Sequence, residues 1–189
     1  MIRVIHYMVT YILEFCVIIV ITLPFYLILR SPWHRDPRRE AALAVFVLFM
    51  AGLLALALRG TYQAPGRMLE TAAYRLKSGD RINLIPFRSI YAYFTHYGLD
   101  AFLVNFVGNI VMFMPWGFGM TLLWKKLQNP GIVILCSLAL TAFIETAQLF
   151  IGRSVDVDDL ILNFAGSCLG AGICCILRKK FPKLAEIAI

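Results

Sequence analysis

Five long, uninterrupted apolar runs constrain this chain more than any other feature of its sequence. The hydrocarbon core of a bilayer is about 30 Å thick, and an α-helix crosses it in about 20 residues. The runs cover approximately residues 5–29, 41–58, 100–124, 131–151 and 157–177. Because lipid offers the backbone no hydrogen-bond partners, each run is predicted to be a transmembrane helix. The sequence therefore predicts an all-α polytopic membrane bundle of about five spans and excludes a soluble domain.

The charge distribution favours one orientation of this bundle. The chain is 60% hydrophobic and carries a net charge of +7. If the N-terminus lies outside, the basic linkers 30–40 and 125–130 and the basic tail all face the cytoplasm, as the positive-inside rule prefers. The long connection 59–100 is also basic, but long loops count for less in this rule. We therefore expect an N-out, C-in protein whose positive charge serves topology and anionic lipids rather than nucleic acid.

The connection between the second and third spans is too long to be a simple linker. Its middle, PGRMLETAAYRLKSGD, has Pro65 and Gly66 at its start and Gly79 at its end, which predicts a short interfacial helix. The following RINLIPFRSIYAYFTHYG is rich in Tyr and Phe, which predicts a re-entrant or membrane-hugging loop. The predicted units are two N-terminal helices (1–60), this connection (61–99), a three-helix core (100–178) and a basic cytoplasmic tail (179–189).

Polar side chains of the last three spans are predicted to share one shallow layer of the membrane. The spans alternate in direction, so residues near the start of the third and fifth spans lie at the same depth as residues near the end of the fourth. The residues concerned are Asn105, Asn109, Glu145, Gln148, Asp159 and Asn163. The same side receives Arg153, Asp156 and the Asn83 loop. These nine residues are the predicted ligand-binding set, with Arg153 expected to pair with Asp156 or Asp159.

Each of these residues also has a purely structural interpretation. Asn and Gln inside membranes often only bridge helices, whereas an ionisable residue such as Glu145 is costly at depth and is functional by default. Asp156 and Asp158 could be solvated charges at the rim. A divalent metal at Asp156, Asp158 and Asp159 is only weakly indicated, because three side chains of one helical turn cannot all point inward, so no metal site and no cofactor is predicted.

These motifs resemble those of the VanZ-like family of bacterial membrane proteins. The resemblance rests on NLIPF at residues 83–87, GNIVMFMPWGF at 108–118, IETAQ at 144–148 and GRSVDVDDLILNFAGSCLG at 152–170. It covers roughly residues 80–178, with the first two spans largely outside it. The founding member is associated with resistance to the glycopeptide teicoplanin, so the resemblance implies a role in the bacterial cell envelope and a location in the cytoplasmic membrane.

Three kinds of function fit this pattern. The first is a binding protein whose outward polar pocket holds the headgroup of an envelope lipid, a cell-wall lipid precursor or a lipoglycopeptide antibiotic, and so contributes to glycopeptide resistance. The second is an intramembrane enzyme that modifies such a lipid, with Glu145 and Asp159 as its catalytic carboxylates. The third is a lipid transporter. Binding is preferred, because no nucleophile motif, phosphate loop or cofactor fingerprint is present.

Overall fold

The computed structural model describes residues 2–30, 36–59 and 65–187, and almost all of them are helical. The long helices are α1 (Ile2–Arg30), α2 (Pro37–Ala57), α6 (Gly108–Leu123), α7 (Pro130–Phe150) and α8 (Val157–Lys180). The shorter helices are α3 (Pro65–Ser78), α4 (Arg88–Thr95) and α5 (Leu99–Ala101), and the strands are β1 (Ile82–Asn83) and β2 (Val155–Asp156). A π-helix (Phe102–Val107) joins α5 to α6, and 3-10 helices cover Lys125–Gln128 and Pro182–Ile187. The boundary at residue 60 and the last two residues of the predicted tail lie outside the described residues.

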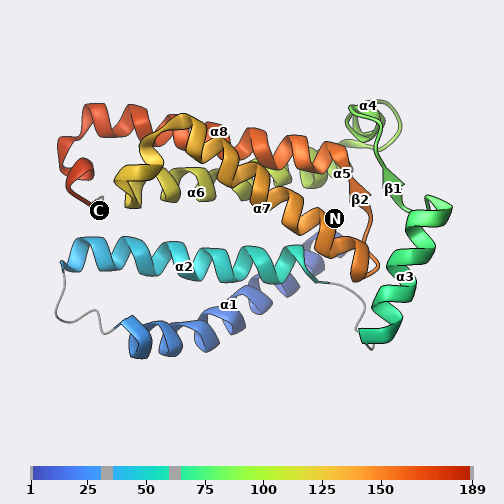
Figure 1. Cartoon of the computed structure of the whole chain (residues 1–189), viewed down its shortest axis with the longest axis horizontal. Coiled ribbons are helices and arrows are strands. Elements are labelled where there is room, and N and C mark those ends of the chain that lie inside the picture. The colour runs from blue at the N-terminus through green and yellow to red at the C-terminus, as the bar shows by residue number, and fades with distance from the viewer. Residues whose placement is uncertain (1, 31–35, 60–64, 188–189) are drawn as a thin grey trace.

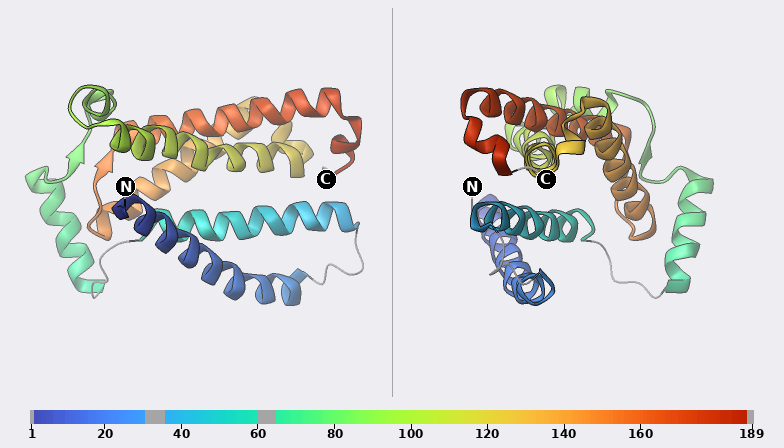
Figure 2. Two further views of the ribbon diagram at one scale, coloured as in Figure 1. Left: turned by 180° about the vertical axis from the view of Figure 1, so that it is seen from behind. Right: turned by 60° about the vertical axis from the view of Figure 1, so that its left-hand side comes forward.

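Four helical stretches in the described part are long and apolar enough to cross a membrane. They are α2, the continuous stretch Leu99–Leu123, α7 and α8. This confirms an all-α membrane bundle. In α1 the apolar stretch found is the shorter Cys16–Arg30, so the fifth span stays a prediction. Figure 1 shows α6, α7 and α8 above α2, with α1 running obliquely below, and Figure 2 shows the same arrangement from behind and from one end.

Helices α6 and α8 approach each other closely because glycines line their contact. A Cβ atom added to Gly170 would lie 1.9 Å from the backbone oxygen of Met114, and one on Gly166 would lie 2.1 Å from that of Ile110. From the other helix, a Cβ on Gly117 would lie 1.8 Å from the oxygen of Ser167. Only glycine fits at such contacts, so Gly166 and Gly170 form part of a helix-packing surface.

A small core connects α2 to α6 and α7. Leu53 from α2, Phe113 from α6 and Ile144 from α7 are each at most 2% exposed and form one cluster. Many other large apolar side chains are exposed on the surface of the described part of the chain. This pattern is the one expected when lipid, rather than water, surrounds the helices.

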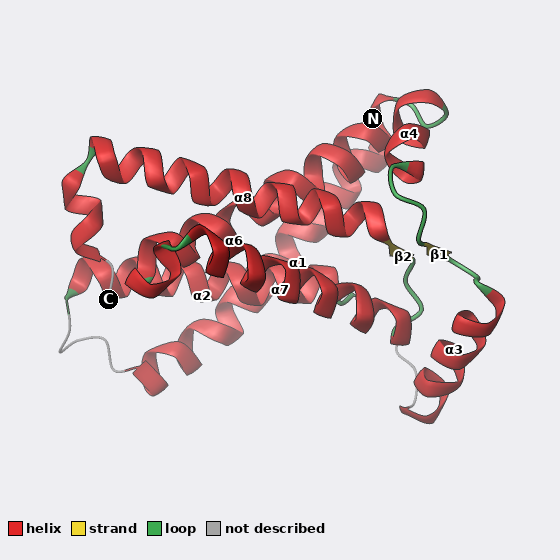
Figure 3. Cartoon of the chain, turned by 45° about the horizontal axis from the view of Figure 1, so that its top comes forward, coloured by secondary structure: helices red, strands yellow, loops and turns green. Residues whose placement is uncertain are grey.

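The connection after α2 contains the predicted short helix and, in the segment predicted as a loop, the strand β1 and the helix α4, which the sequence did not predict. Helix α3 covers Pro65–Ser78, close to the predicted bounds. After it, β1 pairs in parallel with β2, with Ile82 opposite Val155 and Asn83 opposite Asp156. Figure 3 shows these two strands side by side between α3 and the start of α8. The pairing attaches the loop to the last hairpin of the bundle, while its position relative to the membrane stays a prediction.

Candidate functional site

Asp156 joins the β1–β2 pair to the start of α8. Its carboxylate caps α8 by accepting a hydrogen bond of 2.9 Å from the backbone N–H of Asp158. The same carboxylate accepts 2.9 Å from Nδ2 of Asn83, and it also accepts from the hydroxyl of Ser89. Asn83 donates to the Ser89 oxygen as well, over 3.1 Å. Asn83, Ser89 and Asp156 therefore form one connected network at the mouth of the bundle.

Asp158 is the anchor of helix α4. Its side chain is 0% exposed and accepts hydrogen bonds from the backbone N–H groups of Phe87 (2.5 Å), Ser89 (2.7 Å) and Ile90 (3.1 Å). These donors lie at the start of α4, where N–H groups have no partner inside the helix. The interpretation of Asp156 and Asp158 as solvated rim charges was therefore wrong, because both are buried and fully engaged.

Two of the predicted carboxylates deeper in the bundle accept hydrogen bonds from other segments. Glu145 is 6% exposed, and its Oε2 accepts 3.0 Å from the backbone N–H of Asp156. Asp159 accepts 2.8 Å from Nδ2 of Asn109, which links α8 to α6. The first contact joins α7 to the residue that caps α8, and the second joins α8 to α6. Each carboxylate therefore has a structural role, because its hydrogen bond connects two segments of the chain.

Gln148 and Arg153 both donate hydrogen bonds to carbonyls at the end of α2. Nε2 of Gln148 donates 3.0 Å to the carbonyl of Ala57. Nη1 of Arg153 donates to the carbonyls of Ala57 and Leu56, over 3.0 and 3.1 Å. These carbonyls belong to the last turn of α2, which lacks intrahelical donors. The predicted ion pair of Arg153 with Asp156 or Asp159 is wrong, since no such contact forms within 4.0 Å between these described residues.

The remaining two predicted residues are less connected. Nδ2 of Asn105 donates 2.9 Å to the carbonyl of Ala101, so this contact stays within its own helical segment. Asn105 lies in the π-helix, an irregularity that often accompanies functional sites and that the sequence did not predict. Asn163 is 4% exposed, and its Oδ1 accepts no hydrogen bond from any described residue. The predicted set is therefore brought to one end of the bundle but is not a single pocket lining.

Arg75 is a residue of this end that the sequence analysis missed. It is 3% exposed on α3, and its guanidinium donates to the carbonyls of Leu149 (3.0 Å) and Gln148 (3.4 Å) at the end of α7. It also donates 3.1 Å to the carbonyl of Arg81, just before β1. The only available signal was general: the last carbonyls of a helix need donors, and a long guanidinium can supply several.

A polar hollow of about 380 Å³ opens beside the β1–β2 pair. It is lined by Gly79, Arg81, Ile82, Asn83, Arg88, Ser89, Ser154, Val155 and Asp156. Two of these are the predicted residues Asn83 and Asp156. Arg81 uses one nitrogen for a 3.4 Å contact with the carbonyl of Gly152, and Arg88 is exposed. The hollow therefore combines two guanidinium groups with the amide and hydroxyl that Asp156 holds in place.

An aromatic hollow of about 530 Å³ lies on α4 and the turn that follows it. It is lined by Tyr93, Phe94, Thr95, His96, Tyr97, Gly98, Leu99 and Phe102. Burial raises the pKa of Tyr93 to about 12, and the negative charge of Asp159 adds to the shift. Its phenol is therefore a neutral hydrogen-bond donor at any physiological pH.

A family model described as VanZ/LLP1 matches residues 43–178, which is more than half of the chain. This chain belongs to the VanZ-like family. No curated protein and no solved structure matches it. The match starts within α2, so most of the second span and all of α3 belong to the VanZ-like region. The sequence motifs alone had placed these two helices largely outside that region. All nine predicted binding residues lie inside the match.

The VanZ-like region leaves out most of α1. Glu14 of α1, which the sequence did not assign, forms an ion pair of 3.0 Å with Arg59 near the end of α2. Among the described residues, no group of three or more His, Cys, Asp or Glu side chains is arranged to hold a metal ion. At its polar end this VanZ-like protein presents hydrogen-bonding amides and hydroxyls, carboxylates and guanidinium groups.

Proposed function

We propose that this VanZ-like protein binds the phosphate-bearing headgroup of an envelope lipid in the polar hollow beside β1 and β2. The observation that carries the proposal is the pair Arg81 and Arg88, which flank Asn83 and Ser89 in one hollow of about 380 Å³. Guanidinium groups recognise phosphate through charge-assisted, often bidentate, hydrogen bonds. The amide oxygen of Asn83 and the hydroxyl oxygen of Ser89 beside them can accept hydrogen bonds from the hydroxyls of a sugar.

The carboxylate of Asp156, which lines the same hollow, is compatible with phosphate binding there. Asp156 already accepts hydrogen bonds from Asn83, Ser89 and the backbone of Asp158, which stabilise its negative charge. Its role is to fix the orientation of Asn83 and Ser89, whose side-chain polar hydrogens are all used within this network, so that Arg81 and Arg88 supply the donors for the phosphate. A preorganised set of this kind loses less entropy on binding than free side chains would.

The aromatic hollow on the same helix extends the proposal to a glycosylated or bulky headgroup. Tyr93, Tyr97 and Phe102 line this hollow, while Ser89 of the same α4 helix lines the polar hollow. Aromatic faces pack well against the apolar faces of sugar rings and against lipid chains. A cell-wall lipid precursor or a lipoglycopeptide antibiotic carries both kinds of group, and sequestering or competing with either would contribute to glycopeptide resistance.

The location proposed for this binding is the outer face of the bacterial cytoplasmic membrane. The N-out, C-in orientation places the β1–β2 end outside, and the basic ends of α1 and α8 inside. We prefer binding to catalysis or transport because oxygens of Glu145 and Asp159, the candidate acid and base, accept hydrogen bonds from the protein's own donors. One oxygen of each carboxylate therefore has a structural role, and no nucleophile motif accompanies the pair.

The test compares a polyprenyl phosphate with the matching polyprenyl alcohol, bound to purified protein in phosphatidylcholine nanodiscs. We expect the phosphate to bind at least tenfold more tightly, and Arg81→Ala and Arg88→Ala each to weaken its binding about tenfold. Arg67→Ala is the matched control, because Arg67 is an exposed arginine of α3 outside the hollow. Equal binding of phosphate and alcohol, or unchanged binding by the Arg81 and Arg88 double variant, would contradict the proposal.

A further inference from the structure

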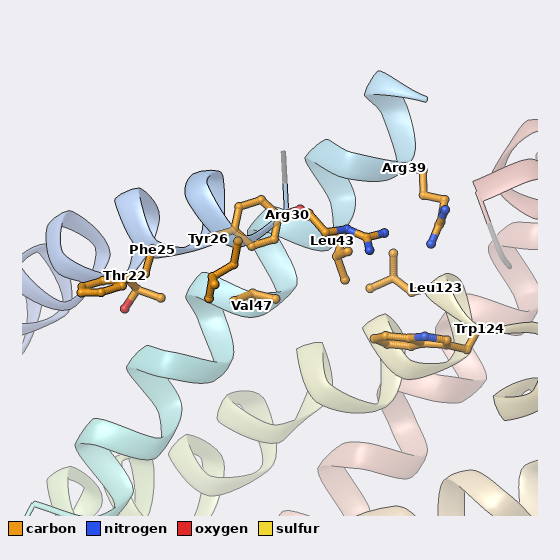
Figure 4. A pocket seen from close by; sticks show the side chains of 10 residues that line it. Thr22, Phe25, Tyr26, Arg30, Arg39, Leu43, Val47, Leu123 and Trp124 are labelled. Carbon is orange, nitrogen blue, oxygen red and sulfur yellow. The ribbon is translucent and has the colours of Figure 1, made fainter. Parts of the chain in front are cut away.

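A second cavity lies at the opposite end of the bundle, between α1, α2 and the end of α6. Its volume is about 460 Å³. It is lined by Thr22, Phe25, Tyr26, Leu29, Arg30, Arg39, Leu43, Val47, Leu123 and Trp124. None of these residues belongs to the predicted site, and the polar hollow shares no residue with it. Figure 4 shows the side chains that surround it.

The walls of this cavity change from apolar to cationic along both helices. On α2, Arg39, Leu43 and Val47 follow one another at four-residue spacing, so they lie on one face over about 12 Å of helix. On α1, Tyr26 and Arg30 follow the same spacing. In Figure 4 the two guanidinium groups lie toward one end of the row of side chains, and Thr22 and Phe25 lie toward the other.

The two arginines differ in whether their guanidinium groups are already paired within the protein. Arg30 is committed to the buried Glu40, to which it donates 3.0 and 3.1 Å hydrogen bonds, and Tyr26 donates to the same carboxylate. This pair neutralises Arg30 and clamps α1 to α2. Arg39 forms no hydrogen bond or ion pair with a described residue in the structure, although it lines the cavity. An unpaired positive charge beside an apolar wall favours a ligand that has both a negatively charged group and an apolar part.

The surroundings are those of a membrane surface. Phe25 is 64% and Leu29 is 85% exposed on the outer side of α1, so the cavity borders the lipid-facing surface. Trp124 lies where α6 ends, and an indole is favoured at headgroup depth. Lys125 and Lys126 follow directly, and Arg178, Lys179 and Lys180 end α8, so this end of the bundle is basic. Basic side chains at a membrane surface attract anionic lipids.

We infer that this cavity is a binding site for one anionic phospholipid, whose phosphate pairs with Arg39 while an acyl chain lies along Leu43 and Val47. The occupant is a lipid rather than a soluble phosphate, because most of the wall is apolar and meets the lipid-facing surface. It is anionic because the free guanidinium of Arg39 favours a headgroup with net negative charge. The site is independent of the proposed headgroup site at the β1–β2 end.

The test measures retention of phosphatidylglycerol and phosphatidylcholine by the purified full chain, using native mass spectrometry during titration with each lipid. We expect phosphatidylglycerol to bind at least fivefold more tightly than phosphatidylcholine. Arg39→Ala should remove most of this preference, and Arg39→Lys should keep part of it. Arg38→Ala is the matched control, because Arg38 lies in the same turn and is exposed outside the cavity.

A second variant tests the apolar half of the site. Val47→Phe fills the cavity below the arginines, so it should weaken both lipids while thermal unfolding confirms that the protein is folded. Glycerol 3-phosphate in large excess should not displace phosphatidylglycerol. The inference is overturned if Arg38→Ala and Arg39→Ala lower the preference equally, if Val47→Phe leaves lipid retention unchanged, or if glycerol 3-phosphate displaces the lipid.

Discussion

The backbone N–H of Ser89 donates a 2.7 Å hydrogen bond to the carboxylate of Asp158, although the two residues are 69 positions apart in the chain. With the N–H groups of Phe87 and Ile90, this contact replaces the missing intrahelical partners at the start of α4. A buried carboxylate with three backbone donors is well satisfied, whereas the same donors without it would be buried and unpaired. The position of α4, and of both hollows that it lines, therefore depends on one aspartate of α8.

Replacing Asp158 by alanine should release α4 from the bundle. We expect the free energy of unfolding to fall by about 3 kcal/mol, because three N–H groups lose a charged acceptor. Hydrogen exchange at Phe87, Ser89 and Ile90 should become faster. Asp100→Ala is the control, since Asp100 is an exposed acid farther along the same connection. Protection of the three amides that is equal in the two variants would show that Asp158 does not anchor α4.

The contact between α6 and α8 predicts opposite effects of the same substitution at two glycines of one helix. Gly170→Ala places a Cβ atom 1.9 Å from the backbone oxygen of Met114, so the helices must separate and the protein should lose stability. Gly172→Ala meets nothing within 4 Å and should be neutral or stabilising by up to about 1 kcal/mol. Thermal unfolding in detergent measures both. A Gly170→Ala protein as stable as the Gly172→Ala protein would contradict the close packing.

Glu145 separates the binding proposal from the enzyme alternative. Glu145→Gln keeps an oxygen that can accept from the backbone of Asp156, whereas Glu145→Ala leaves that buried N–H unpaired at a cost of about 1–3 kcal/mol. If the protein binds its ligand, the glutamine variant should retain resistance to a lipid-tailed glycopeptide and the alanine variant should lose it, at matched membrane levels. Equal loss in both variants would favour an acid or base role of Glu145.

The orientation can be tested at Ser154, an exposed residue that lines the polar hollow. In a background without the five native cysteines, Ser154→Cys should react with an impermeant thiol reagent in intact cells. Asn129→Cys, at the exposed start of α7 near the opposite end, should react only after lysis. The reverse pattern would place the hollow in the cytoplasm and would exclude an extracytoplasmic headgroup as its ligand.

The spans and the shared depth of their polar residues could be predicted because both follow from local rules. Hydrophobic length defines α7 and α8, and the alternation of spans places Glu145 near Asp156. Helical spacing could not show which donor meets which acceptor. Arg153 was expected to pair with a nearby carboxylate but donates to the last carbonyls of α2. Predicting this contact requires knowing where α2 ends in space.

The features that the sequence did not predict depend on contacts between segments far apart in the chain. The β1–β2 pair is only two residues long on each side, so neither strand has a periodic pattern to detect. Arg75 reaches α7 from a helix that looks merely amphipathic, with Leu69 and Leu76 exposed and Arg75 buried. Each of these contacts depends on the path of the chain in three dimensions rather than on its local sequence.

The parallel pairing of β1 with β2 also fixes an order of events during biosynthesis. The segment around Asn83 leaves the ribosome 73 residues before its partner Asp156, which corresponds to roughly 4–15 s of translation. Throughout that interval the loop lacks its hydrogen bonds to Asp156 and Asp158, because these acceptors lie on the last hairpin of the bundle. The β1–β2 end of the protein is therefore completed only after the start of α8 has been synthesised.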